Sequence, residues 1–181
     1  MTDLSTWPGV STLWPDGFTP DPWSAEFVAG AVTAFLKSQT LPGLVSVFEA
    51  YPITWGDPAN FFGSGVPFGV GSFIQTRKER QGQLYTANGK PERTVTHEVR
   101  VVGLFKSTLN DATAVTILAR RIEDSIKEAI RQNPTLGGRV FEAGIARLDA
   151  ERDPASKDEN SNHCVWFSVD FEVTVLAPPK P

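Results

Sequence analysis

The sequence predicts a single α+β domain, a mainly antiparallel sheet with two helices packed on one face. Apolar residues recur at steps of three and four between Val115 and Ile130, which predicts a long amphipathic helix. Apolar and polar residues alternate from His163 to Val175, which predicts a strand. The expected order is helix, three strands, helix, two strands. We divide the chain into an aromatic and proline-rich arm (1–22), the α+β domain (23–177) and a short tail (178–181).

Composition excludes several classes of protein. The net charge of −4 argues against a general nucleic-acid binder, which usually carries a basic field. A single cysteine excludes an internal disulfide framework and fits a reducing compartment. The chain has no apolar run of spanning length and no charged-then-apolar leader, so we expect it to be soluble, unprocessed and away from membranes.

The arm combines breakers of regular structure with large apolar groups. Its prolines and glycines rule out a long helix or strand, yet it carries Trp7, Trp14 and Phe18, which a solvated tail would not normally contain. Two interpretations stay open. The arm folds back over its own domain, or it docks on a neighbouring copy through its aromatic side chains.

The first helix is expected to begin at Asp21-Pro22, where an acceptor side chain precedes a proline in the first turn. It ends near Ser38, and Leu41-Pro42-Gly43 forms a turn. An alternating strand, buried on both faces, follows between Leu44 and Ala50.

The segment from Trp55 to Gly71 is rich in glycine and phenylalanine. No Gly-Lys-Ser/Thr follows and no helix opens behind it, so it does not fit a phosphate-binding loop. It fits either a mobile surface loop or a loop in which Phe61, Phe62 and Phe68 pack against a partner.

The next two strands are expected at Phe73–Arg80 and Arg93–Phe105. The connection 81–92 contains an Asn88-Gly89 turn but is too long for a tight hairpin. This is the most basic part of the chain, and it includes Arg77, Lys78 and Arg80. Glutamates interrupt it, which favours an ion-paired rim over a phosphate contact.

The long helix is capped by Asn110 or Asp111, and Pro134 makes Asn133 its last possible position. Glu123 and Lys127 are placed on its solvated face as a pair four residues apart. A strand from Arg139 to Ala150 follows, with a bulge at Gly144. The charged segment Glu151–Asn162 is expected to be a loop before the final strand.

The candidates for nucleophilic or metal chemistry are few. His163 and Cys164 are adjacent, so on a strand they point to opposite faces. His97 shares a strand face with Val95 and Val99, which indicates a structural histidine. The carboxylates near residues 149–159 do not have the spacing of a calcium loop and have basic neighbours. We therefore expect no catalytic residue, cofactor or metal.

Residues 72–148 resemble the tail terminator proteins of long-tailed bacteriophages. The resemblance consists of a strand ending in RKER, the strand THEVRVVGLFKS, the helix NDATAVTILARRIEDSIKEAIRQ and the run NPTLGGRVFEAG. The run from the helix through Asn-Pro-Thr-Leu-Gly to Glu-Ala-Gly is its most specific part.

This resemblance implies a virion protein of the head-proximal tail end, made in the host cytoplasm. Such a protein forms a ring, commonly a hexamer, on the last tail-tube ring, stops polymerisation and joins the tube to the head connector. Double-stranded DNA passes through the ring without specific binding. The residues expected at its interfaces are Trp7, Trp14, Phe18, Phe61, Phe62, Phe68, Arg77, Lys78 and Arg80.

Two alternatives remain. One is another neck, tail-completion or tail-tube protein of similar fold. The other is a small enzyme or ligand-binding module that uses His97.

Overall fold

The computed structural model describes residues 20–41, 44–48, 68–85, 91–107, 111–154, 156–157 and 163–177. Its helices are α1 (Ala25–Ser38) and α3 (Ala112–Gln132). Its strands are β1 (Leu44–Phe48), β2 (Phe68–Tyr85), β3 (Pro91–Ser107), β4 (Glu142–Arg152), β5 (Ser156–Lys157) and β6 (His163–Ala177).

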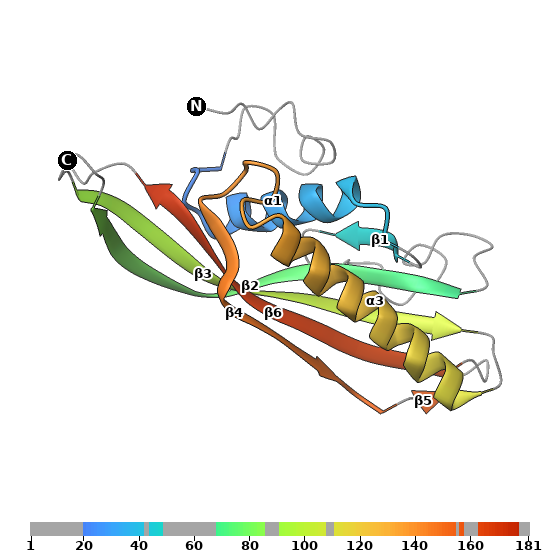
Figure 1. The fold of residues 1–181 in the computed structure, drawn as a ribbon. Helices are drawn as coiled ribbons and strands as arrows, with labels where there is room; N and C mark the ends of the chain where they lie inside the picture. The colour runs from blue at the N-terminus through green and yellow to red at the C-terminus, as the bar shows by residue number, and fades with distance from the viewer. Residues whose placement is uncertain are drawn as a thin grey trace.

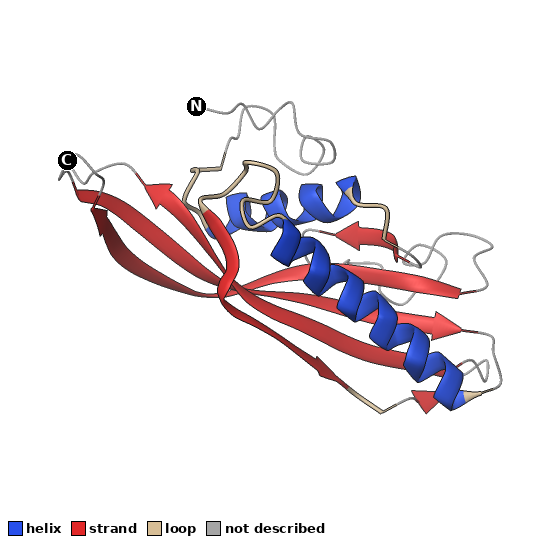
Figure 2. Ribbon diagram, in the orientation of Figure 1, coloured by secondary structure: helices blue, strands red, loops and turns tan. Residues whose placement is uncertain are grey.

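The strands form one sheet in the order β1-β2-β3-β6-β4, and β5 also pairs with β6. Every described pairing is antiparallel except the one between β1 and β2, which is parallel. Both helices lie on the same side of the sheet (Figures 1 and 2). The predicted class, an α+β domain with a mainly antiparallel sheet and two helices on one face, is confirmed.

The core lies between the helices and alternate residues of the two central strands. In β3 the row that includes Val95, Val99 and Val101 is buried, and in β6 the row from Val165 to Val175 is buried. The buried stripe of α3 packs over β6 and β4, while α1 packs over β1 and β2. The apolar residues that recur at every second position of the strands and about every 3.6 positions of α3 therefore form a single core.

The helix starts follow capping chemistry. The Asp111 side chain accepts hydrogen bonds from the backbone N–H groups of Thr113 and Ala114, at 2.9 and 3.3 Å, as predicted for this cap. The prediction for α1 was wrong by a few residues. Its N-cap is Ser24, whose hydroxyl accepts from Phe27 N–H at 3.1 Å, because the carbonyl of Asp21 is already used in a turn by Ser24 N–H.

Several strand bounds differ from the predictions. β2 runs on to Tyr85 and β3 begins at Pro91, so the connection predicted at 81–92 is only residues 86–90. Residues 81–83 are Gln-Gly-Gln and are exposed, so no apolar alternation marks the continuation of β2.

The segment after α3 also differs. β4 begins at Glu142 rather than Arg139 and runs to Arg152, and the expected loop at 151–162 contains β5. The predicted bulge is present, since Gly144 has φ 71° and the pairing with β6 shifts between Ala143 and Leu148. Asn88, Gly89 and Asn110 lie outside the described residues.

The turn between α3 and β4 is left-handed over three successive residues. Leu136, Gly137 and Gly138 have φ values of 48°, 72° and 82°. Glycine adopts this conformation without cost, whereas Leu136 adopts it with its side chain fully buried. Thr135 supports the turn, because its hydroxyl accepts from Gly138 N–H at 3.1 Å. The Asn-Pro-Thr-Leu-Gly-Gly run therefore sets where β4 starts.

Sequence analysis gave no role to Gly103, which lies on β3 opposite Phe167 of β6. A Cβ at this position would lie 2.2 Å from Cζ of Phe167, and the Phe167 side chain is itself buried. Glycine is required there for room and not for backbone conformation.

We predict that Ile126→Asp unfolds the protein, because a buried unpaired carboxylate costs several kcal/mol. Ile126 is fully buried, whereas Ile117 on the same helix is 48% exposed, so Ile117→Asp is the matched control. Circular dichroism in urea should show a native-like control and a collapsed midpoint for Ile126→Asp. Equal midpoints would contradict the packing of α3 on the sheet.

We predict that Gly103→Ala lowers the free energy of unfolding by about 1–3 kcal/mol, because the Phe167 ring must leave its position. Gly138→Ala is a contrasting control, since its Cβ meets no atom and the cost comes only from the positive φ. Combining Gly103→Ala with Phe167→Leu should recover part of the loss. An additive double variant would show that the clash with Phe167 is not the cause.

Candidate assembly surfaces

A hollow opens at the end of the domain where the α3–β4 turn, the start of α1 and the end of β6 meet. We call it the end groove, and its volume is about 720 Å³. Its described lining is Pro22, Phe27, Thr135, Gly138, Arg139, Val140, Phe141, Val175 and Leu176. Most of these side chains are apolar, so the groove suits an apolar occupant.

Exposed apolar side chains lie at the rim of this groove. Among the described residues, four large hydrophobic side chains are exposed, and two of them, Phe141 (41%) and Leu176 (42%), line the groove. A third, Ile145 (67%), lies on β4 four residues after Phe141. Phe141 N–H donates to the carbonyl of Thr174 at 3.0 Å, which places it beside the end of β6. Scattered apolar residues are normal on a surface, but exposed apolar side chains at the rim of an apolar groove are typical of an interaction site.

The geometry of the groove wall depends on the α3–β4 turn. Arg139 Nη1 donates to the carbonyl of Leu136 at 2.7 Å, and the backbone N–H of Arg139 donates to Thr135 at 2.9 Å. The N–H of Ala143 donates to the carbonyl of Pro134 at 2.6 Å. These bonds hold the wall rigidly against the start of β4.

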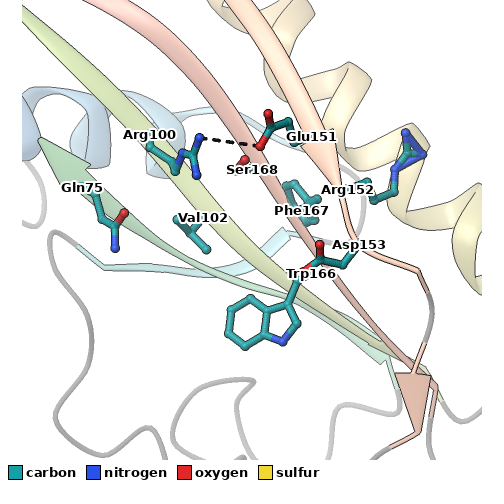
Figure 3. A pocket seen from close by; sticks show the side chains of 9 residues that line it. All are labelled: Gln75, Arg100, Val102, Glu151, Arg152, Asp153, Trp166, Phe167 and Ser168. Atoms are coloured by element: carbon teal, nitrogen blue, oxygen red, sulfur yellow. Dashed lines mark ion pairs between the residues drawn. The ribbon is translucent and has the colours of Figure 1, made fainter. Parts of the chain in front are cut away.

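The face of the sheet away from the helices carries charged pairs beside apolar residues such as Val102 and Trp166. Arg100 donates from Nε and Nη2 to the two carboxylate oxygens of Asp170, both at 2.6 Å, and its Nη2 lies 3.8 Å from Glu151 Oε2 (Figure 3). The hydrogen bonds with Asp170 raise the pKa of Arg100. This bidentate geometry joins β3 to β6 on the side that the two helices leave open.

Further pairs continue across the same face. The Arg80 guanidinium pairs with Glu172, Arg147 Nε lies 2.8 Å from Asp149 Oδ2, and the hydroxyls of Thr96 and Thr174 lie 3.0 Å apart. A shallow hollow of about 210 Å³ lies next to Arg100, lined by Gln75, Arg100, Val102, Glu151, Arg152, Asp153, Trp166, Phe167 and Ser168 (Figure 3). Arg80, Arg100 and Arg147 are each paired with a carboxylate, so the described residues of this face form no continuous basic track for a phosphate backbone.

The sequence-predicted interface residues fall into two groups. Trp7, Trp14, Phe18, Phe61 and Phe62 lie outside the described residues. The others lie on β2: Phe68 is its first residue, Arg77 is at the bulge, Lys78 follows it, and Arg80 is exposed and paired with Glu172. The pairing of Arg80 agrees with the ion-paired rim favoured from sequence. The end groove was missed, because its lining comes from segments far apart in the chain.

His97 is buried in the helix-facing row of β3. Its Nε2 lies 2.8 Å from the backbone carbonyl of Trp23, and because a carbonyl only accepts, Nε2 carries the hydrogen. The bond ties the segment before α1 to the sheet. This is the geometry of a structural histidine.

His163 and Cys164 are adjacent residues on one continuous strand, β6, and both are buried. Among the described residues, no group of three or more histidine, cysteine, aspartate and glutamate side chains could hold a metal ion. Asp158 and Glu159, two of the carboxylates weighed in the sequence, lie outside the described part of the chain.

The prediction that Glu123 lies on a solvated face was wrong. Its carboxylate is buried and accepts from Arg152 Nε at 3.1 Å, and Lys127 Nζ lies 3.4 Å from its other oxygen. Lys127 is also 2.9 Å from Asp124, and that hydrogen bond lowers the pKa of Asp124. The missed signal was Arg152, which continues the helix-facing row of Leu148 and Ala150 on β4.

No protein-family model matches the chain, and neither does any curated protein. Within the described helices, none combines the length and apolar character needed to span a bilayer.

We predict that His97→Leu lowers the free energy of unfolding by about 1–3 kcal/mol, because the carbonyl of Trp23 loses its donor. His97→Gln keeps an N–H donor and should lose less. Urea unfolding measures both, and sedimentation should show the native mass unchanged. A His97→Gln protein that folds normally but no longer assembles would mean that this histidine does more than hold Trp23.

Proposed function

We propose that this protein assembles into a ring on the end of a phage tail tube, where it stops tube polymerisation and provides the joint to the head connector. The observation that carries the assembly part is the apolar end groove, at whose rim Phe141 and Leu176 are exposed. An isolated domain would leave this surface in water, whereas a ring repeats one heterologous contact that covers it in every subunit.

The tail-terminator part rests on the sequence resemblance over residues 72–148. These residues correspond to the stretch from β2 through β3 and α3 into β4, and the most specific run, from the helix through Asn-Pro-Thr-Leu-Gly to Glu-Ala-Gly, contributes one wall of the end groove. The other wall comes from the start of α1 and the end of β6, outside the segment that carries the resemblance.

Charge supports a passive role toward DNA. The net charge is −4, and the open sheet face pairs its cations with carboxylates such as Asp170 and Glu172. Since DNA is held mainly by neutralisation of its phosphates, a bore formed by such surfaces lets the duplex pass. The partners we propose are the tail-tube protein, the head connector and further copies of this chain.

Another neck, tail-completion or tail-tube protein of similar fold is the second candidate, because the same apolar end suits any ring contact. The two candidate functions differ in their effect on a growing tail tube. A terminator binds the finished end and stops growth, whereas a tube protein continues it. The hydrogen bond between His97 and Trp23 is the reason that we do not propose an enzyme using this histidine.

We predict that the purified protein has a native mass of several copies, six for a hexamer, of the 19.8 kDa chain. Added to the polymerising tail-tube protein encoded by the same genome, it should shorten the tubes and appear at one end only in electron micrographs. Heat-denatured protein is the control. A stable monomer would contradict the ring, and unchanged tube lengths with a stable ring would favour the second candidate.

A further inference from the structure

The end groove has an apolar lining and no occupant among the described residues. Phe141 and Leu176 are both more than 40% exposed at its rim, although Val140 and Phe27 beneath them are buried. A volume of about 720 Å³ is within the range of pockets that enclose a ligand of several rings. It can take more than one aromatic side chain.

The same chain carries a segment of matching chemistry. Residues 1–19 lie outside the described part and join it at Pro20, two residues before Pro22 of the groove lining. This arm contains Trp7, Trp14 and Phe18. Each tryptophan or phenylalanine can bury about 150–250 Å² of surface, which makes these side chains strong interface anchors.

We propose that the end groove of one subunit receives the N-terminal arm of a second copy, with the arm tryptophans as its anchors. The inference rests on the proposed ring and names the contact that would hold it together. An arm and a groove at different places on one chain form a heterologous contact, which is the type that generates a ring when its rotation closes.

The reach of the arm extends beyond its own groove. The chain turns where the arm joins the domain, since Ser24 N–H donates to the carbonyl of Asp21 at 2.8 Å and Pro22 lies within that turn. Pro22 also lines the groove, so the groove lies at the origin of its own arm. The thirteen residue steps from Trp7 to Pro20 span up to roughly 45 Å when extended, enough to reach the groove of a neighbouring subunit.

Cross-linking of the full chain tests which groove the arm occupies. Leu176→Cys is combined with Ser5→Cys, Ser11→Cys or Thr12→Cys in turn, and each protein is treated with a short bismaleimide. Linked multimers on denaturing gels are expected for at least one pair. Ile117→Cys, a position of similar exposure on α3, replaces Leu176→Cys as the control and should give none. A second control carries Leu176→Cys without an arm cysteine, and it measures any cross-link that forms through the buried Cys164.

The other outcomes overturn the proposal. A link within one chain, identified by peptide mass spectrometry, would mean that the arm covers its own domain. No link, or equal linking to the Ile117→Cys control, would mean that the arm binds elsewhere.

The same surface should control the strength of assembly. We expect Leu176→Asp to raise the protein concentration at half-dissociation of the ring at least about tenfold with an unchanged melting temperature, because an apolar contact is replaced by a charge. Ile117→Asp should leave it unchanged. A monomeric wild-type protein would contradict the ring itself, whereas a stable ring that tolerates Leu176→Asp would contradict only the groove assignment.

Discussion

The apolar row of β6 facing the helices holds the described fold together. β6 pairs with β3 along one edge and with β4 and β5 along the other, and α3 packs on its row from Val165 to Val175. The left-handed turn at Leu136 returns the chain from α3 to β4 beside this strand. The end groove exists because the turn, the end of β6 and the start of α1 meet at one place. Its shape is consequently set by the core and not by a free loop.

The two faces of the sheet are stabilised by different interactions. Toward the helices the contacts are apolar, with Glu123 and Arg152 as a buried charged pair between α3 and β4. Such a pair adds little net stability, but loss of either partner would leave an uncompensated charge. Away from the helices, the Arg100–Asp170 pair joins neighbouring strands through two charge-assisted bonds. The charged pairs lie around Arg100, whereas the exposed apolar side chains Phe141 and Leu176 lie at the end of the sheet beside the groove.

Periodicity was sufficient to predict the fold class, α3 and β6, and capping chemistry gave Asp111 as one of two possible caps. The sequence failed where a pattern was absent: the polar residues 81–83 hid the length of β2, and Ser24 took the capping role expected of Asp21. Glu123 was misplaced because helical periodicity says nothing about Arg152 on a strand 29 residues away. The end groove could not be foreseen, since Phe27, Phe141 and Leu176 come together only through the tertiary fold. The resemblance to tail terminators rests on the order of the elements and on short sequence runs. The end groove is known only from the structure.

The position of β6 has a consequence for synthesis on the ribosome. It is the last of the described strands, yet it lies between β3 and β4 in the sheet. Until residues 163–177 have left the exit tunnel, both of those strands expose an unpaired edge, and α3 lacks the surface that it covers. Long-range pairing of this kind is slow and leaves nascent chains prone to aggregation. A chain truncated before β6 therefore lacks the strand that joins β3 to β4, and the apolar stripe of α3 has no β6 surface to cover.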